Sequence, residues 1–183
     1  VTAMDNYWPM HWISKLNTSQ LSNLISLNKP LVSREINEIH EINQENSPDV
    51  GDIPSIKEFK ELTELSDVIY AFKDKDKIIG FILLMREGSS YKSENYKFIS
   101  SQYDKFLYVD RIAIQSNYRR RGLAETIYKK AINDAKRLGL DLLCEVNTRP
   151  RNDISLAFHS KMGFREIGTQ DFTKNSVVYL CKR

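Results

Sequence analysis

The segment from Phe106 to Gly139 constrains the fold of this chain more than any other, and it reads FLYVDRIAIQSNYRRRGLAETIYKKAINDAKRLG. It begins as a short apolar strand, continues into a cationic turn and ends in a stretch whose apolar residues have helical spacing. These residues are Leu123, Ala124, Ile127, Tyr128, Ala131, Ile132, Ala135 and Leu138. The spacing predicts an amphipathic helix with one buried face, and Gly139 is positioned to end it.

The turn between this strand and this helix carries Arg119, Arg120, Arg121 and Gly122. The N–H groups of a first helical turn have no acceptor inside the helix, and together they present roughly half a positive charge. An anion is therefore favoured there, glycine lets the backbone approach it closely, and guanidinium groups match the geometry of phosphate. The segment predicts a phosphate cradle.

The flanking sequence predicts the other elements. In the first half of the chain we expect a short helix capped by Thr18 or Ser19 and containing Leu24 and Ile25, the end of a strand at 31–33, a helix capped by Ser33 and a loop at 46–54. A helix whose first turn holds Pro54 and a hairpin at 67–85 should follow. After the central helix we expect a strand at 140–147, a helix capped by Asn152 or Asp153, and strands at 164–169 and 176–181. The strands before and after the central helix form a β-α-β unit, so we expect them to be parallel.

Length and composition limit the classes of protein that the chain fits. Its 183 residues, 41% hydrophobic and 28% charged, suit one globular domain. The sequence has no membrane-length apolar run and no signal pattern, so we expect a cytoplasmic protein without a membrane partner. A net charge of +3, with the basic cluster confined to one turn, does not indicate nucleic-acid binding.

Cysteine and histidine usage argues against disulfides and metals. Cys144 and Cys181 stand in apolar, strand-like surroundings and are expected to be reduced core thiols. His40 lies among acidic residues of a predicted helix, where a solvated position suits it better than a metal site. We expect no metal.

Two motifs resemble those of a known family. Arg119, Gly122 and Ala124 fit the Arg/Gln-x-x-Gly-x-Gly/Ala signature of the GNAT superfamily of N-acetyltransferases. A second GNAT signature is matched further on, by Asn152, Ser155, Phe158, His159, Gly163 and Phe164. Two motifs in the expected order and on the expected elements are stronger than either alone. The chain resembles a subgroup of predicted acetyltransferases whose acceptors are unassigned.

The resemblance implies an α/β (α+β) fold. It consists of a central mixed, mostly antiparallel sheet of six to seven strands with a splayed parallel pair, flanked by about four helices. The expected acetyltransferase domain covers 33–183, with 1–32 as an N-terminal extension. Segment 88–105 has aromatic residues but no period, so we interpret it as a loop that either lines the acceptor pocket or is a surface excursion.

The resemblance also implies that acetyl-CoA binds between the splayed strands. The residues expected to contact coenzyme A are Ile112, Ala113 and Ile114 on the strand edge, Arg119, Arg120, Arg121, Gly122, Leu123, Ala124 and Glu125 at the pyrophosphate, and Asn147, Asn152, Ser155 and His159 along the pantetheine arm. A backbone N–H at the splay, that of Ile112 or Ala113, would stabilise the oxyanion.

Acyl transfer to an amine needs a base, and it needs a proton for the departing sulfur. Asp110 and Glu145 are the candidate bases, acting directly or through a water, although Asp110 could equally pair with Arg111 to hold the strand ends. Many family members carry a tyrosine acid where this chain has His159. The acid is therefore His159, or Tyr108 or another group, or His159 only contacts coenzyme A.

These residues favour an acetyl-CoA-dependent N-acetyltransferase that acts on a primary amine of a small-molecule or amino-acid-like acceptor by direct attack. The alternative is a coenzyme A binding or sensing protein with little turnover. The expected partners are the amine and acetyl-CoA, with no nucleic acid, and homodimer formation stays open.

Overall fold

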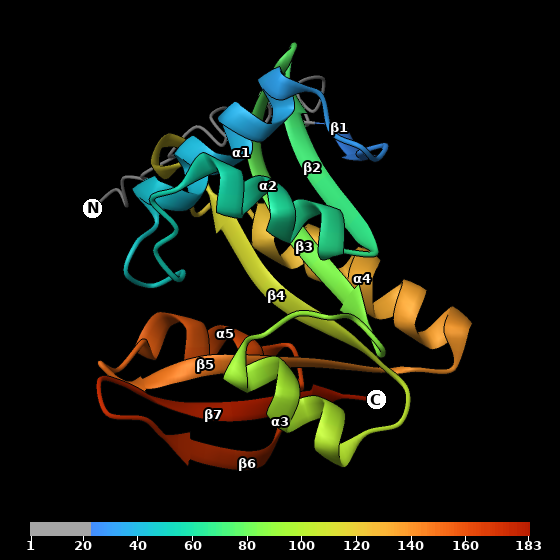
Figure 1. Ribbon diagram of the computed structural model, residues 1–183, viewed down its shortest axis with the longest axis vertical. Coiled ribbons are helices and arrows are strands. Elements are labelled where there is room, and N and C mark those ends of the chain that lie inside the picture. The colour runs from blue at the N-terminus through green and yellow to red at the C-terminus, as the bar shows by residue number, and fades with distance from the viewer. Residues whose placement is uncertain (1–22) are drawn as a thin grey trace, which may run out of the picture.

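The protein is built on a sheet of seven strands in the order β1-β2-β3-β4-β5-β7-β6 (Figure 1). The computed structural model describes residues 23–183. The strands are β1 (Asn23–Ser26), β2 (Val68–Asp74), β3 (Lys77–Arg86), β4 (Phe106–Ile114), β5 (Asp141–Arg149), β6 (Arg165–Asp171) and β7 (Ser176–Lys182). Among the strands of residues 23–183, only the β4–β5 pair is parallel, which confirms the predicted mixed sheet.

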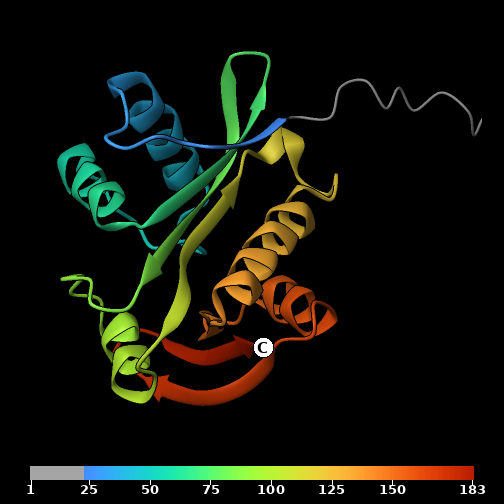
Figure 2. The same cartoon turned by 90° about the vertical axis from the view of Figure 1, so that its right-hand side faces the viewer.

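Helices cover both faces of the sheet. They are α1 (Ser33–Glu45), α2 (Ile56–Leu65), α3 (Glu94–Gln102), α4 (Leu123–Leu138) and α5 (Asp153–Lys161), with a short 3-10 helix at Ser116–Tyr118. Helices α1, α2 and α3 lie on one face and α4 and α5 on the other (Figure 2). Each face has its own apolar core, and strand side chains alternate between the two. Within residues 23–183 there are five α-helices, one more than expected.

The parallel pair comes apart shortly after it begins. Strands β4 and β5 pair over three residues, from Phe106 opposite Asp141 to Tyr108 opposite Leu143. Beyond that point β5 pairs only with β7, and β4 only with β3. The two strands diverge from their shared end, as Figure 1 shows. The splayed pair implied by the resemblance is therefore confirmed.

A bulge in β4 lies next to the point of divergence. Val109 pairs with Leu84 and Arg111 with Leu83, so Asp110 is an extra residue on β4. Such a residue reverses the alternation of side chains along a strand. Tyr108 lies before the bulge and Ala113 after it, and both belong to the core beneath α1 to α3. In a regular strand, residues five apart would point to opposite faces. The bulge thus turns Ile112 and Ile114 toward α4.

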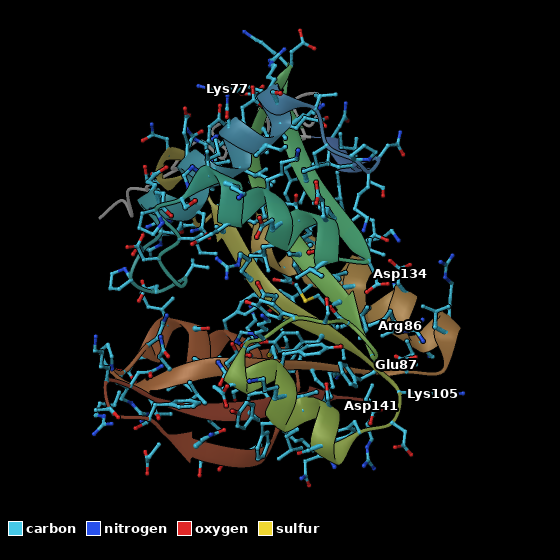
Figure 3. All side chains as sticks on the ribbon, in the orientation of Figure 1. Lys77, Arg86, Glu87, Lys105, Asp134 and Asp141 are labelled. Atoms are coloured by element: carbon cyan, nitrogen blue, oxygen red, sulfur yellow. The ribbon has the colours of Figure 1, made fainter. Side chains whose placement is uncertain are left out.

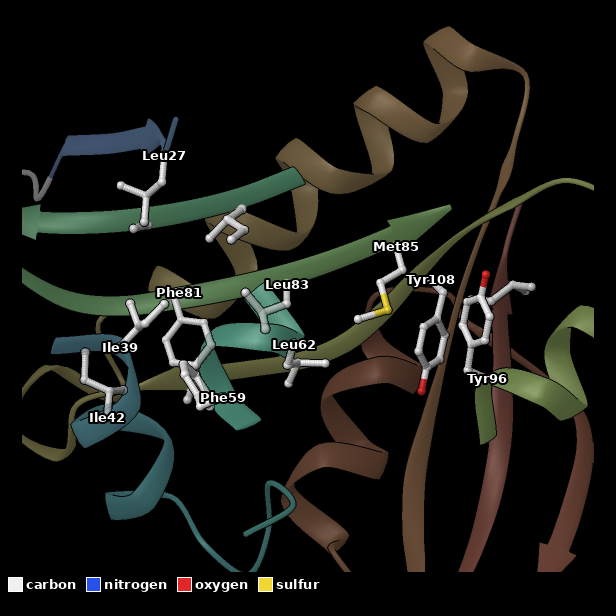
Figure 4. Close-up of a cluster of buried hydrophobic side chains, with 14 of the residues drawn as sticks. Leu27, Ile39, Ile42, Phe59, Leu62, Phe81, Leu83, Met85, Tyr96 and Tyr108 are labelled. Atoms are coloured by element: carbon white, nitrogen blue, oxygen red, sulfur yellow. The ribbon is translucent and has the colours of Figure 1, made fainter. Parts of the chain in front are cut away.

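Segment 88–105 is not the simple loop that the sequence predicted, because it contains α3. Ser93 begins the helix, where its hydroxyl accepts the N–H of Tyr96. The Tyr96 hydroxyl donates to the Arg86 carbonyl at 2.6 Å and accepts the Ser89 N–H at 3.0 Å. Its ring meets that of Tyr108 at 5.7 Å between centroids (Figure 4). Tyr96 therefore fastens the insertion to the end of β3.

A second fastening closes the base of this insertion. Arg86 and Glu87 lie where the chain leaves β3, close to Lys105, where it returns to β4 (Figure 3). The Arg86 guanidinium donates two hydrogen bonds to Glu87, at 2.7 and 2.9 Å, and the Phe106 N–H donates to Glu87 at 3.3 Å. These donors hold the pKa of Glu87 at about 2. The ionised carboxylate ties the two ends of the insertion together.

Three local predictions near the N-terminus are wrong. Leu24 and Ile25 lie in β1, which pairs with β2, rather than in a helix, and the strand expected to end at 31–33 is absent there. Edge pairing to an existing sheet outweighs local helix preference. His40 is half-buried instead of solvated, because its Nε2 lies 2.7 Å from the Ile53 carbonyl and its ring packs on Phe59. Thr18 and Ser19 lie outside the described residues.

Helix capping shows smaller differences. Ser33 is the first residue of α1, and the Glu35 carboxylate accepts the Val32 N–H in place of a serine cap. Pro54 precedes α2, whose cap is Ser55. Cys144 and Cys181 are both buried and free, as expected. Among the described residues, no helix is long and apolar enough to cross a membrane, and no cluster of three metal-ligating side chains occurs.

Tyr96→Phe should lower the free energy of unfolding by about 1–2 kcal/mol, because it leaves a partly buried carbonyl and a partly buried N–H without their partner. Urea denaturation measures this loss. Lys97→Ala is the control on the same helix, since its exposed ion pair with Glu94 should contribute little. Equal stability of Tyr96→Phe and the wild type would show that the hydroxyl does not fasten the insertion.

Candidate active site

The cationic turn folds into an open cradle at the start of α4. Gly122 is the residue before the helix and has φ +79°, and Arg120 has φ +61°. Left-handed backbone of this kind turns successive N–H groups toward one side. The first N–H of the helical ladder is that of Thr126, which donates to the Gly122 carbonyl at 3.0 Å. The amides of Leu123, Ala124 and Glu125 precede it, and a Cβ on Gly122 would meet no atom within 4 Å.

The three arginines of the turn differ in their contacts. Arg119 donates to the Ile114 carbonyl at 3.2 Å and to the Asn46 side chain at 2.9 Å, so it braces the turn against β4 and the end of α1. Arg121 donates to the Asn117 carbonyl at 2.8 Å and lies over the Tyr118 ring. Arg120 is exposed. Arg119 and Arg121 therefore hold the turn in its conformation through these contacts. Arg120 is the arginine best placed to bind an anion.

The two diverging strands provide the walls beside this cradle. Ile112, Ala113 and Ile114 pair with β3 on one edge, while their other edge faces the gap left by β5. Across the gap, the Asn152 side chain caps α5 by accepting the Ser155 N–H at 3.0 Å, which confirms the predicted cap. Asn147 accepts the Asn152 N–H through its carbonyl at 3.1 Å. The predicted pantetheine residues thus hold the turn from β5 into α5.

His159 lies in the core between α4 and α5, with 4% of its surface exposed. Its Nε2 is 2.8 Å from the Tyr128 hydroxyl and its Nδ1 is 2.8 Å from the Ser155 carbonyl. A carbonyl only accepts, so Nδ1 carries the proton and Nε2 accepts from Tyr128. Burial lowers the pKa of His159, which keeps the ring neutral. Both nitrogens are thus engaged within the protein, which argues against a role as the acid.

Glu145 and Tyr108 meet at the fork of the strands. Tyr108 is the last residue of β4 that pairs with β5, and its hydroxyl donates to Glu145 Oε2 at 2.7 Å. Asn95 of α3 donates to the other oxygen, Oε1, at 3.0 Å. Burial raises the pKa of Glu145 to about 8, despite the opposing effect of these two donors. Burial also raises the pKa of Tyr108, which stays protonated. The fork therefore holds a carboxyl group that titrates near neutral pH.

Asp110 pairs with Arg111, which was the structural alternative to a role as the base. Its side chain is 3% exposed and forms an ion pair with Arg111 at 2.7 Å. Arg111 continues to the Asn43 side chain at 2.9 Å and to the Gly51 carbonyl at 3.2 Å. The pair ties the bulge of β4 to α1 and to the loop that follows it. This arrangement favours the bracing role over that of a base.

Sequence reasoning missed three residues of this site. Tyr179 of β7 donates toward Asn95 Oδ1 at 2.9 Å and lies 2.8 Å from Gln170 of β6, so that both connect to Glu145 through Asn95. Asn95 and Gln170 stand in segments without a motif, and Tyr179 looked like an ordinary core residue of a strand. Nothing local could have revealed them, since Asn95 is 50 residues from Glu145 and 84 from Tyr179.

A sheet that opens between two parallel strands, an open glycine turn at the start of α4 and a carboxyl group at the fork are together what an acyl-CoA-dependent N-acyltransferase needs. The sequence confirms this class, because residues 36–164 match the model of the Acetyltransferase (GNAT) family. The chain belongs to that family and is an acetyltransferase with acetyl-CoA as its cosubstrate. The open cradle at Gly122 and the free edge at Ile112–Ile114 fit such a molecule.

Solved structures support the fold. The ribosomal-protein-S18-alanine N-acetyltransferase of Escherichia coli is similar at 16% identity and a TM-score of 0.63, over 88% of this chain and 92% of that one. An N-acetyltransferase from Staphylococcus aureus Mu50 is 18% identical with a TM-score of 0.62, over 88% and 98%. Arabidopsis thaliana NAA60, solved with acetyl-CoA, is 14% identical with a TM-score of 0.64, over 87% and 98%. No curated protein sequence matches significantly.

Gly122→Ala should weaken coenzyme A binding by at least about tenfold, because it adds a methyl group, in space that no protein atom fills within 4 Å, to the backbone expected to approach the pyrophosphate. Gly139→Ala at the other end of α4 is the matched control. It has the same left-handed backbone, φ +67°, with open space around it, but it does not face the cradle. Both variants should lose about 1–2 kcal/mol of stability, and only Gly122→Ala should lose affinity in calorimetry. Equal affinities would place the pyrophosphate elsewhere.

His159→Phe should change the pH dependence of stability more than turnover. The folded pKa of His159 lies below its unfolded value of 6.5, so its protonation favours unfolding and stability falls as pH drops below about 6.5. The variant lacks this contribution, so urea denaturation at pH 7.5 and 5.5 should show its deficit shrinking at the lower pH. Loss of turnover at unchanged stability would instead restore the acid role.

Proposed function

We propose that this acetyltransferase transfers the acetyl group of acetyl-CoA to a primary amine of a small-molecule or amino-acid-like acceptor, with Glu145 as the base. The main support for this proposal is the carboxyl group of Glu145, which accepts hydrogen bonds from Tyr108 and Asn95 at the fork of the strands. When bound, acetyl-CoA supplies an acetyl group activated as a thioester. The residues of the protein bind it, orient the amine and move its protons.

The raised pKa of Glu145 supports its assignment as the base. An alkylamine is mostly an ammonium ion at neutral pH and cannot attack until it loses a proton. A carboxylate of ordinary pKa accepts such a proton poorly, whereas one with a pKa of about 8 is closer to the ammonium in proton affinity. Burial therefore makes Glu145 a stronger base, at the cost of being protonated below that pH.

An opening beside Glu145 supports access for the acceptor. A hollow of about 610 Å³ lies between the start of α3 and the turn from β6 to β7. Its lining residues are Glu94, Asn95, Asp171, Phe172, Thr173, Lys174 and Asn175. Asn95 belongs both to this lining and to the contacts of Glu145. Asn95 therefore connects the hollow to the base from the α3 side, while the cradle lies at the start of α4, on the opposite face (Figure 2).

Glu145→Gln should reduce turnover by about 10²- to 10⁴-fold while leaving acetyl-CoA affinity within about twofold. In the wild type, kcat/KM should rise with pH and reach half its maximum near pH 8, because the base acts only when it is deprotonated. The variant should lose this rise. Thiol release from acetyl-CoA with a panel of primary amines gives the rates, and calorimetry gives the affinity.

Glu166→Gln, an exposed glutamate on β6, is the control and should behave as the wild type. Turnover by Glu145→Gln at the wild-type rate would remove Glu145 as the base. Tight acetyl-CoA binding by the wild type without thiol release across the panel would instead favour the coenzyme A binding or sensing function.

A further inference from the structure

Asn95 is held by hydrogen bonds at both ends of its amide. Its Nδ2 donates to Glu145 Oε1 at 3.0 Å, and its Oδ1 accepts from the Tyr179 hydroxyl, 2.9 Å away. Turning the amide over would place its carbonyl against the Glu145 carboxylate and its NH₂ group against the Tyr179 hydroxyl proton. When Glu145 is ionised, both contacts therefore specify one orientation, with the NH₂ group toward Glu145.

Tyr179 links Asn95 to a third side chain, so that the hydrogen bonds form a series. Its oxygen also lies 2.8 Å from Gln170 Oε1, yet a hydroxyl has only one proton to donate. If that proton serves Asn95, the Gln170 amide has to be turned over, so that its NH₂ group rather than Oε1 faces the Tyr179 oxygen and donates to it. Every donor in the series from Gln170 through Tyr179 and Asn95 then points toward Glu145, and hydrogen bonds aligned in this way strengthen one another.

Packing and hydrogen bonds hold the residues of this hydrogen-bond series in place. Tyr179 is fully buried in β7, and its ring stacks on Phe98 of α3 with 4.1 Å between centroids and 11° between planes. Phe98 is one helical turn beyond Asn95, so the stack fixes the helix that carries the amide. Tyr96 fixes the same helix to β3 through Arg86. Asn95 is thus placed from two sides, although it belongs to an insertion between two strands.

We propose that Asn95 is a positioning residue for the acetyl transfer, which aims one oxygen of the Glu145 carboxylate and favours its ionised form, with Tyr179 and Gln170 holding Asn95 in place. This inference rests on the proposed function, because it takes Glu145 as the base. It assigns a catalytic purpose to the α3 insertion. The acceptor enters past the same side chain, since Asn95 lines the hollow.

Several other groups also act on Glu145 and stay constant in the test. The titratable or charged side chains that face it or influence it are Tyr108, Asp110 and Arg111 from β4, Tyr179 from β7, Tyr128 from α4 and the neighbouring Cys144. Asn95 and the protonated Tyr108 are both uncharged donors to Glu145, and of the two only Asn95 cannot titrate. A change at Asn95 therefore alters the hydrogen bond to Glu145 without removing a charge.

Two variants of similar size separate positioning from packing. Asn95→Leu removes the donor, and Asn95→Asp replaces it by a second carboxylate next to Glu145. Both changes disfavour the ionised base, and the aspartate does so more strongly because like charges repel. The acidic limb of the pH profile is the range over which kcat/KM rises as Glu145 loses its proton. This limb should move upward by about one pH unit in Asn95→Leu and further in Asn95→Asp. Acetyl-CoA affinity should stay within about twofold.

Tyr179→Phe should move the limb in the same direction by a smaller amount, because it frees the amide to turn but keeps its donor. Ser101→Ala, on the exposed side of α3, is the control and should leave the profile unchanged. Thermal unfolding of each variant shows whether it is folded. A folded Asn95→Leu with reduced kcat and an unmoved limb would overturn the positioning role, as would equal profiles for the leucine and aspartate variants.

Glu145→Gln, measured alongside, separates this inference from the function on which it rests. If Glu145→Gln is impaired and the limb of Asn95→Leu does not move, Glu145 is the base and Asn95 does not position it. If Glu145→Gln has wild-type turnover and pH dependence, the assignment of the base itself fails.

Discussion

The short pairing between β4 and β5 is the constraint on which the rest of this structure depends. Hydrogen bonds join the strands only from Phe106 to Tyr108, and the bulge at Asp110 then turns β4 away. Backbone groups left without a partner strand are costly unless something else accepts them. The sheet thereby creates both an edge suited to an extended, amide-bearing ligand and a narrow end where Glu145 and Tyr108 meet.

The narrow end balances two opposing effects on Glu145. Burial raises its pKa, while hydrogen bonds from Tyr108 and Asn95 lower it. A fully apolar fork would keep the carboxyl group protonated, and a solvated one would leave it too weak a base. The donors come from both sides of the fork, one from β4 and one from the insertion. The protonation of Glu145 thus depends on how the two halves of the sheet are held together.

The sequence predicted what depends on neighbouring residues. The helix after Gly122, its glycine stop and the Asn152 cap follow from local spacing and capping, and the structure confirms each. Helix α3 was missed because only Tyr96 and Ile99 are buried in it, which is too weak a pattern. Glu145 was found because it lies beside a motif, whereas its partner Asn95 acts from 50 residues away. Contacts of this range depend on the register of the sheet.

The burial of His159 has a consequence for the proton balance. An ammonium acceptor has two protons to lose in becoming an amide, and the departing sulfur needs one. If Glu145 takes the first, the attacking nitrogen itself can supply the second, so a separate acid is not required by stoichiometry. The Tyr108 hydroxyl, 2.7 Å from Glu145, is a donor at the fork that can relay it. The ring of His159 is then free to serve the core through Tyr128 and Ser155.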